Sequence, residues 1–565
     1  MSGLVKVDVL VVGSGAAGLS AAVTAAMHGA SVMVAEKASV LGGTSAWSGG
    51  WLWIPRNPLA RAEGIDEAAD TPLTYLQHEM GGEAADIRLQ TFLRYGPEMV
   101  EFFHQRTAVQ FLSGSAMPDF HPSPGAANGG RSVTAHPYDG RLLGDWLHRL
   151  RPPLETISLG GMGIAGGADM AHFFNATRSP RSALYAARRL LRHGWQRLRA
   201  GRGQHLVNGN ALVARLLRSA LDAGVRFQLN APVVRLLQGP PGMSGAVLRS
   251  DGGEIHVEAG AVVLACGGFP HDRQRLAQVV PHAAEGYGHF SAAPPDNQGE
   301  GIRLGESVGG QFDTSLRHPL AWAPVSRVTL ASGQQLMFPH LVERAKPGVI
   351  AVLPNGKRFV NEADSYHDFI AALLAATPAG DTPQAWLLAD RRTLRRYGLG
   401  HARPFPFTPT AWLRTGYLQR GNTLAELAKQ CAIDANALAE TVERFNHFAS
   451  TGEDVDFHRG ASAYNRAQGD HQVTLGPLRE GPFYAVRILP GSLGTFSGLQ
   501  TDEHARVLDE QQQPIPGLYA IGNDMSSVMR GYYPSGGITL GPAMTFGYLV
   551  GKNLAKKTNI NNNIT

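Results

Sequence analysis

A strand, a glycine-rich turn, a helix and a second strand follow one another in VDVLVVGSGAAGLSAAVTAAMHGASVMVAE. Gly13, Gly15 and Gly18 form a GxGxxG pattern directly after the first apolar run. In such a unit the first two glycines let the backbone approach a pyrophosphate, and the third lets the helix pack on the strand. Glu36 ends the second strand about 20 residues further on, where a carboxylate binds ribose hydroxyls. This segment therefore predicts a Rossmann-like site for a dinucleotide.

Three further segments favour FAD over NAD as that dinucleotide. The glycine- and serine-rich ASVLGGTSAWSGGWLWIP continues from the acidic strand and could wrap a pyrophosphate and reach a flavin ring. AGAVVLACGGF at 259–269 and GLYAIGNDM at 517–525 repeat the strand–glycine pattern far along the chain. Because no second complete GxGxxG follows, a separate nicotinamide site is not expected. The spacing predicts one flavin domain assembled from distant segments.

Length and composition limit the remaining classes. A chain of 565 residues, 43% hydrophobic and 17% charged, is long enough for two or three globular domains. Its two cysteines, Cys266 and Cys431, leave no motif for attached haem, iron–sulfur clusters or a structural zinc, so no metal is expected. Unpaired cysteines, no leader pattern and no apolar run of 18 residues predict a reducing, cytoplasmic location.

One segment, RSPRSALYAARRLLRHGWQRLRAGR, holds eight arginines between residues 178 and 202 and predicts a basic amphipathic helix. Its leucines and Trp195 recur at helical spacing, which favours a helix packed on the core with a solvated charged face. The alternative is a peripheral contact with anionic lipid. Nucleic acid is not expected as a partner, because no aromatic-rich basic motif accompanies the arginines.

Motifs along nearly the whole length resemble one flavoprotein family, which contains fumarate reductases, succinate dehydrogenase flavoprotein subunits and 3-ketosteroid dehydrogenases. They are GSGAAGLSAA, EKASVLGGTSAWSGGWLWIP, QGEGIRLGESVGG, NGKRFVNE, GLQTDEHARVL, GLYAIGND and GGITLGPAMTFGYLVG. The resemblance implies an α/β fold whose Rossmann-like FAD-binding domain is built from N- and C-terminal segments around an inserted α+β catalytic domain. The expected bounds are 1–310 (with a helical insertion at about 60–205), 311–485, and 486–565.

The resemblance also implies the residues that contact FAD. They are Gly13, Ser14, Gly15, Ala16, Ala17, Gly18, Glu36, Lys37, Gly42, Gly43, Thr44, Ser45, Ser48, Gly49, Gly50, Val233, Ala265, Gly267, Gly522, Asn523, Thr539 and Leu540. The flavin is expected to be non-covalent, because residues 36–50 lack the histidine that attaches it in some relatives.

The positions that would bind substrate separate a dicarboxylate from a ketone. Fumarate reductases hold carboxylates with arginine and histidine. Here the residue after FVNE that corresponds to their proton-donating arginine is Tyr366, LGTFSGL at 493–499 has no histidine, and YPS replaces a late arginine. Buried carboxylates without cations cost several kcal/mol each. A phenol-lined pocket instead suits an uncharged cyclic ketone.

In the 3-ketosteroid dehydrogenases, the tyrosine after FVNE is the general base, and a later tyrosine with a glycine N–H grips the C3 carbonyl. The resemblance assigns these roles to Tyr366, Tyr533 and Gly537. Ser535, two residues after Tyr533, resembles the branch that desaturates C4–C5 of 5α-steroids, so Δ4-(5α) chemistry is slightly favoured over Δ1. A smaller cyclic ketone, a fumarate reductase-like reaction and a non-catalytic flavin-binding protein remain as alternatives.

Some features fit the pattern less well. PDFHPSPG places Phe120 and His121 where the Δ1 branch tends to carry a further phenol; His121 is either a proton relay or a capping histidine. His367 adjoins Tyr366 but would face away from it on a strand, so no role is assigned. Tyr366 has to act as a base although free tyrosine has a pKa near ~10, so its pocket is expected to favour the phenolate. The electron acceptor is expected to be external, with a quinone as the candidate.

Overall fold

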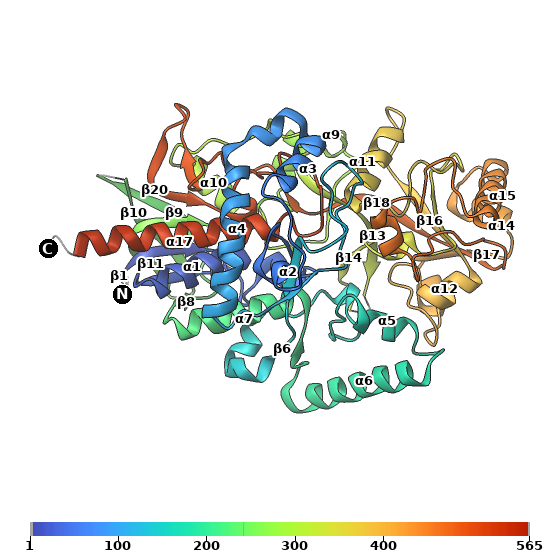
Figure 1. The fold of residues 1–565 in the computed structure, drawn as a ribbon, viewed down its shortest axis with the longest axis horizontal. Coiled ribbons are helices and arrows are strands. Elements are labelled where there is room, and N and C mark those ends of the chain that lie inside the picture. Colours follow the sequence, from blue (N-terminus) through green and yellow to red (C-terminus); the bar gives the residue numbers. More distant parts are fainter. Residues whose placement is uncertain (1–3, 241, 331, 563–565) are drawn as a thin grey trace.

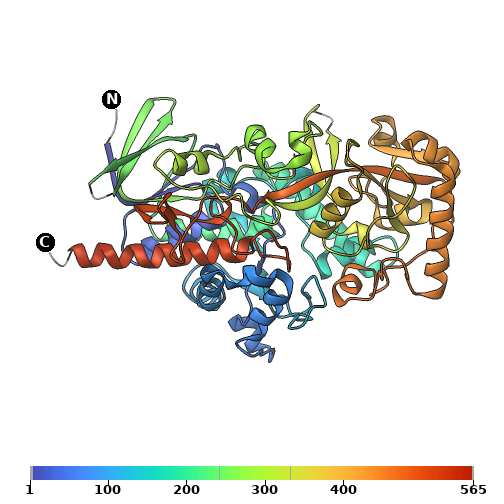
Figure 2. The same ribbon diagram turned by 90° about the horizontal axis from the view of Figure 1, so that it is seen from above.

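A mixed eight-stranded sheet forms one end of the molecule (Figures 1 and 2). The computed structural model describes residues 4–240, 242–330 and 332–562. The order is β19-β20-β11-β1-β2-β8, with β10 and β9 continuing from β11, and the pairs from β20 to β8 are parallel. The strands are β1 (Leu4–Val12), β2 (Val32–Ala35), β8 (Arg226–Gln228), β9 (Val233–Gly239), β10 (Gly242–Ser250), β11 (Gly253–Leu264), β19 (Arg506–Leu508) and β20 (Pro514–Ala520). Strands from both ends of the chain thus share one sheet.

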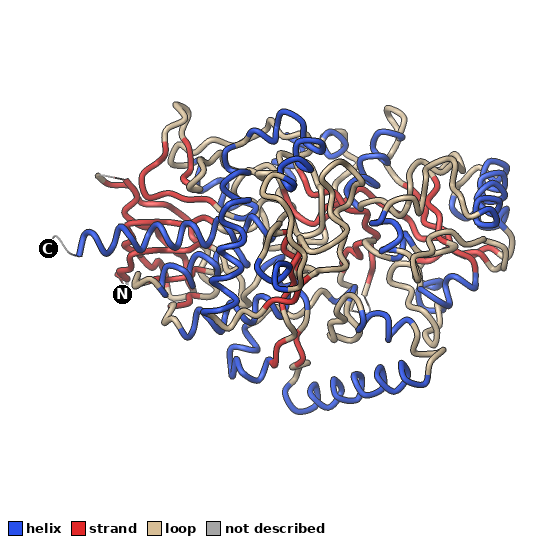
Figure 3. The backbone as a smooth tube through the Cα atoms, viewed as in Figure 1, coloured by secondary structure: helices blue, strands red, loops and turns tan. Residues whose placement is uncertain are grey.

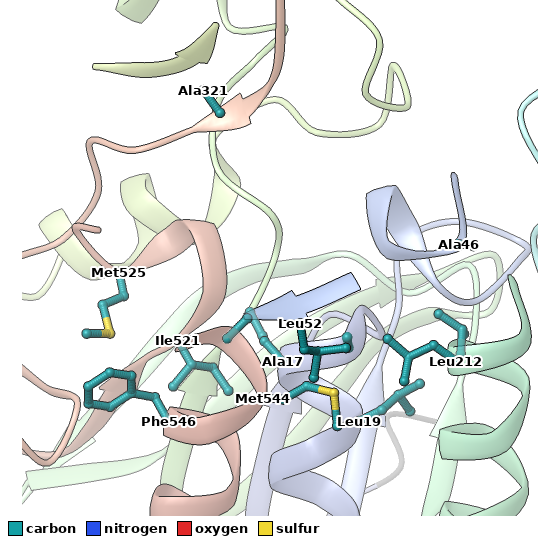
Figure 4. Close-up of a cluster of buried hydrophobic side chains, with 14 of the residues drawn as sticks. Ala17, Leu19, Ala46, Leu52, Leu212, Ala321, Ile521, Met525, Met544 and Phe546 are labelled. Atoms are coloured by element: carbon teal, nitrogen blue, oxygen red, sulfur yellow. The ribbon is translucent and has the colours of Figure 1, made fainter. Parts of the chain in front are cut away.

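Small residues let helices lie close to this sheet and to each other. In α1 (Ala16–Met27) the side chains from Ala16 to Ala25 are all buried. A Cβ on Gly547 of α17 (Leu540–Asn562) would lie 2.6 Å from the Ala17 carbonyl oxygen of α1, so the two helices pack almost backbone to backbone. Figure 4 shows Met544 and Phe546 in the apolar cluster that includes Ala17. The other helices of this part are α7 (Asn208–Asp222), α8 (Arg273–Val279), α9 (Pro281–Ala284) and α10 (Glu300–Glu306).

A seven-stranded, largely antiparallel sheet forms the other end (Figure 3), in the order β14-β13-β18-β16-β15, with β12 and β17 also paired to β18. Its strands are β12 (Phe290–Ser291), β13 (Leu320–Thr329), β14 (Gln335–Pro339), β15 (Val349–Val352), β16 (Ala385–Asp390), β17 (Leu418–Gly421) and β18 (Phe483–Thr495). Its helices are α11 (Tyr366–Ala376), α12 (Arg391–Tyr397), α13 (Thr410–Arg414), α14 (Leu424–Cys431), α15 (Ala435–Thr451) and α16 (Ala463–Gln468). Strand β18 runs through residues 485 and 486, where the sequence suggested a domain boundary.

Helices are the main regular elements of the segment between β2 and α7. It contains α2 (Pro58–Ala62), α3 (Thr71–Met80), α4 (Ile87–Arg106), α5 (Ala168–Phe174) and α6 (Pro180–Ala200). Short strands β3 (Trp51–Trp53), β4 (Phe111–Ser113) and β5 (Ser132–Ala135) form one small sheet, and β6 (Tyr138–Asp139) pairs with β7 (His205–Leu206). Within the described ranges, no helix combines the length and apolar character needed to cross a bilayer.

Candidate active site

A cavity of about 1350 Å³ lies between the two large sheets and is lined by segments from almost the whole chain. One part of its wall is the first glycine turn, and another part carries Tyr366 and Tyr533. The residues with which the sequence predicted a nucleotide site and a ketone site therefore border a single continuous space.

Almost every residue predicted to contact the dinucleotide lines this cavity; Gly18 and Gly42 do not. Gly18 lies against β1, since a Cβ there would come within 2.1 Å of the Gly13 carbonyl oxygen, which is the helix-packing role expected of the third glycine. Gly42 has a φ of +113°, and its N–H donates to Ser14 Oγ (3.0 Å), so it shapes the loop from behind.

Gly13 and Glu36 line the part of the cavity that is predicted to hold the nucleotide. Gly13 has a φ of +107°, and a Cβ there would lie 2.2 Å from the Ala265 carbonyl oxygen. The Glu36 carboxylate, at the end of β2, accepts hydrogen bonds from the Ser14 N–H (3.1 Å) and Ser14 Oγ (2.6 Å). Beside them, a Cβ on Gly15 would meet only Ser45 Oγ, at 3.4 Å, so the helix N-terminus opens onto the cavity.

Asn297 is a cavity residue that the sequence analysis missed. Its side-chain amide donates to Thr44 Oγ1 (3.0 Å) and to the Gly267 carbonyl (3.1 Å), and so joins two of the predicted flavin-binding segments. Asn297 immediately precedes the QGEG motif, and that position was the signal that could have found it. The N-terminus of α17, at Leu540, also lines the cavity.

These groups fit FAD. Backbone N–H groups at the start of α1 suit a pyrophosphate, and Glu36 suits ribose hydroxyls. Several glycines that line the cavity have no room for a Cβ, so their backbone itself forms the cavity surface. The positive end of the α17 dipole would stabilise negative charge at the ring end.

The two predicted phenols meet in the cavity wall. Tyr366 Oη donates a hydrogen bond to Tyr533 Oη (2.7 Å), and the rings lie edge to face with centroids 5.1 Å apart. Tyr366 is the first residue of helix α11, so the strand expected here is wrong. Ser365 ends the extended segment and caps the helix by accepting the Asp368 N–H (3.1 Å).

The FVNE motif fixes the start of α11 through a buried charge cluster. The Glu362 carboxylate is fully buried and pairs with Arg358 (2.7 Å) and Arg459 (3.0 Å). These guanidinium groups hold the pKa of Glu362 near 2 despite its burial. Arg344 adds a hydrogen bond to the Glu362 carbonyl (2.8 Å). The motif therefore positions Tyr366 without entering the cavity.

Aromatic side chains surround the phenol pair. Phe120 stacks on Tyr533 at 5.7 Å and packs edge-on against Tyr366 at 5.6 Å. The Tyr464 ring, from α16, has its centroid 4.5 Å from that of Phe120 and also lines the cavity; no sequence motif pointed to it. The turn that carries Tyr533 is held by Pro534, whose carbonyl accepts from the Phe120 N–H and from Tyr75 Oη.

Burial keeps both phenols protonated. It raises the pKa of Tyr366 well above the ordinary value, and the adjacent Tyr533 adds to the rise. Burial also raises the pKa of Tyr533, to about 12, although hydrogen bonds to Tyr366 and Thr539 lower it in part. The expectation that the pocket favours the Tyr366 phenolate is therefore wrong for the protein alone, because desolvation penalises the charged form.

Gly537 presents its backbone to the same space. Its φ is +105°, and a Cβ would lie 2.5 Å from the Trp53 nitrogen, so only glycine fits there. Among the described residues, none accepts a hydrogen bond from the Gly537 N–H, and the residue lines the cavity. Tyr533 and Gly537 are thus two donors that border one cavity.

Three other residues singled out in the sequence lie outside this pair. The Ser535 side chain is buried, and Ser535 is not among the described residues that line the cavity. His121 bridges Glu79 (2.5 Å) and Asp368 (2.7 Å), whose hydrogen bonds outweigh burial and raise the pKa of His121 to about 10. His367 packs on the Tyr533 ring and accepts the Trp322 N–H (3.2 Å), so it supports the site from behind.

A Rossmann-type sheet, a glycine cradle and a phenol pair in one apolar cavity define a FAD-dependent dehydrogenase that acts on CH–CH groups. The chain belongs to the family described as "FAD binding domain", whose sequence model matches residues 8–540. This is the flavoprotein family that includes the 3-ketosteroid dehydrogenases.

Three known proteins illustrate the similarity. The chain is 39% identical to 4-oxocyclohex-2-ene-1-carboxylate 5-dehydrogenase of Sinomonas cyclohexanicum, over 97% of this chain and 94% of that protein. It is 36% identical to 3-oxosteroid 1-dehydrogenase of Mycolicibacterium smegmatis, over 97% of each. The crystal structure of 3-ketosteroid Δ1-dehydrogenase from Sterolibacterium denitrificans superimposes with a TM-score of 0.88 at 36% identity, over 98% of this chain and all of that one.

Proposed function

We propose that the protein desaturates a 3-oxo steroid beside its ketone, at C1–C2. The observation that carries this proposal is the hydrogen-bonded pair Tyr366–Tyr533 on the wall of the cavity that also contains the glycine cradle. The aromatic and apolar surroundings suit a large uncharged ring system. The similarity to 3-oxosteroid 1-dehydrogenases supports the same substrate class.

In the proposed reaction the two phenols move protons as neutral groups. Tyr533 Oη and the Gly537 N–H hold the ketone oxygen, and Tyr366 Oη faces the adjacent carbon. Tyr366 accepts the proton from that carbon while its own proton passes to Tyr533, and the Tyr533 proton passes to the ketone oxygen to give an enol. The direction of the 2.7 Å bond supports this order, because it leaves the Tyr533 proton free for the ketone.

The second half returns the protons. As a hydride leaves the β-carbon, the enol oxygen gives its proton back to Tyr533, Tyr533 returns a proton to Tyr366, and Tyr366 releases one proton to water. Both phenols end neutral, and the substrate has lost H⁺ and H⁻ from neighbouring carbons. When bound, FAD supplies the acceptor for that hydride. We propose that the electrons then leave to an external acceptor, for which a quinone is the candidate.

Regiochemistry is proposed as Δ1 rather than the Δ4-(5α) outcome that the sequence slightly favoured. The Δ4 interpretation depended on Ser535, whose side chain is buried and is not among the described residues that line the cavity. A hydroxyl in that place is poorly located to contact a substrate.

A smaller ketone that carries a carboxylate is the second candidate. The 39% identical relative is named for such a substrate. Two cations that line the cavity, Lys346 and Arg403, form no ion pair within the described residues and instead donate to backbone carbonyls. Burial lowers the pKa of Lys346 to about 8, which a bound carboxylate would reverse. A fumarate reductase-like reaction is less well supported, because phenols occupy the positions at which that branch has cations.

A substrate panel with product analysis tests the proposal. With a dye as acceptor, we expect 4-androstene-3,17-dione to be converted to 1,4-androstadiene-3,17-dione, with anaerobic bleaching of the yellow protein. A product from a 5α-steroid with a new C4–C5 double bond would contradict the Δ1 assignment. Activity confined to 4-oxocyclohexanecarboxylate and lost in Lys346→Met would favour the second candidate.

The pH dependence of kcat/KM separates a neutral relay from a preformed phenolate. With an uncharged steroid and the Lys346→Met variant, which removes the cavity cation whose pKa is about 8, we expect a flat profile between about pH 7 and pH 9, because both phenols have pKa values above the ordinary ~10 and stay protonated. Nearby histidines do not titrate there either: burial lowers the pKa of His367 to about 3, and His121 remains charged. A rise of about tenfold per pH unit would mean that Tyr366 must ionise first.

A further inference from the structure

Helix α6 turns its polar face toward the protein. Its buried residues are Ser182, Ala186, His193 and Gln196. His193 Nε2 contacts the Gly160 carbonyl (3.0 Å), and Gln196 Oε1 accepts the Gln204 N–H (2.9 Å). The helix is therefore attached by hydrogen bonds to a loop, and it runs along the margin of the molecule (Figure 1).

The apolar face of α6 is exposed. Leu184 is 72% exposed, Leu191 76%, Trp195 56% and Leu198 85%, at the i, i+7, i+11 and i+14 spacing of one helix face. The expectation that these leucines pack on the core is wrong, because polar side chains already occupy the inward face. A surface helix normally buries its leucines, so this continuous stripe requires a partner that is absent from the isolated chain.

Arginines flank the stripe on one side. Arg181, Arg188, Arg192 and Arg199 fall about 40–80° around the helix from Leu184, at about 100° per residue. None of the four forms an ion pair within the described residues, and residues 178–202 contain no Asp or Glu. The Arg199 guanidinium lies over the Trp195 ring at 4.2 Å. Such side chains can reach lipid phosphates while the leucines enter the acyl boundary.

The other edge of the apolar face borders the mouth of the cavity. Ala183, Ala187 and Leu190 of α6 line the same cavity as the two phenols. Exposed apolar side chains from two other segments also line it: Ile157, Phe405 and Phe407. The apolar surface therefore continues from the outside of α6 into the cavity.

We propose that α6 docks in the plane of an anionic lipid bilayer, with the cavity mouth open to the acyl chains. The leucine stripe supplies the apolar contact and the unpaired arginines supply the charge complement. A second copy of the chain is a poorer partner, because its arginines would repel. On the proposed function, an apolar ketone would reach the phenols from the lipid without crossing water; that step rests on the proposed function, whereas the docking does not.

Co-sedimentation of the FAD-loaded protein with vesicles tests the docking independently of activity. We expect binding to phosphatidylcholine–phosphatidylglycerol vesicles (about 7:3) and about tenfold weaker binding to phosphatidylcholine alone or at high salt. Leu184→Gln/Leu191→Gln/Leu198→Gln should also weaken binding about tenfold while flavin content stays unchanged. The matched control is Leu4→Gln/Ile87→Gln/Val455→Gln, three residues of similar exposure elsewhere.

Equal binding by both triple variants, or a wild-type protein that stays in the supernatant, would overturn the proposal. Sedimentation equilibrium without lipid covers the remaining case. Self-association that the α6 variant removes, without vesicle binding by the wild type, would assign the stripe to a second copy. If vesicles bind but no ketone is turned over, docking stands and the proposed function fails.

Discussion

Tyr366→Phe is expected to lower kcat/KM for the ketone by about 10²–10⁴-fold, the usual contribution of a positioned acid–base group. The substitution removes the atom that receives the α-proton and leaves the ring, which packs against Phe120 and Tyr533, in place. Flavin content should be unchanged, so anaerobic bleaching by substrate is the direct measurement. Tyr417→Phe is the matched control, because it removes a phenol with hydrogen bonds to Ser326 and His401 outside the cavity lining.

A proton relay through both phenols predicts a result for the double variant that a single base would not. Tyr533→Phe should cost about 10²–10³-fold, like loss of one oxyanion donor. If the phenols pass protons as a unit, Tyr366→Phe/Tyr533→Phe should be little worse than Tyr366→Phe alone. Multiplicative losses in the double variant would show that the two hydroxyls act independently, and wild-type activity in either single variant would remove the site assignment.

Gly13→Ala is expected to bind flavin with roughly tenfold lower affinity, equivalent to about 1.4 kcal/mol, and therefore to retain less flavin through purification. The new Cβ would lie 2.2 Å from the Ala265 carbonyl oxygen, so either the turn or the segment that follows β11 has to move, and both line the cavity. The absorbance ratio of flavin to protein after purification measures the effect.

Gly29→Ala provides the control for backbone strain. Gly29 has a φ of +97°, close to that of Gly13, but a Cβ there meets no atom within 4 Å. Its variant should lose only about 1 kcal/mol of unfolding free energy from the left-handed conformation and keep its flavin. Equal flavin loss in both variants would mean that strain, rather than close approach to the cofactor cradle, explains the effect of Gly13→Ala.

Sequence patterns predicted the parts of the site that depend on local geometry. GxGxxG works within a single strand–turn–helix unit, so Gly13, Gly18 and Glu36 have the positions that their spacing implied. The strands of the later strand–glycine units, β11 and β20, are neighbours in the same sheet, as one domain assembled from distant segments requires. Tyr366 and Tyr533 were named from motifs, but the 2.7 Å bond between residues 167 positions apart required the fold.

By itself, the sequence determined the flavin domain, the choice of phenols over cations and the existence of the arginine-rich helix. These follow from residue type and short-range periodicity. The burial that keeps Tyr366 protonated, the place of Tyr464 in the pocket and the exposure of the α6 leucines depend on how distant segments pack. Desolvation and the direction of a helix face depend on which surfaces other segments cover, and periodicity gives the faces of a helix without saying which one is turned inward.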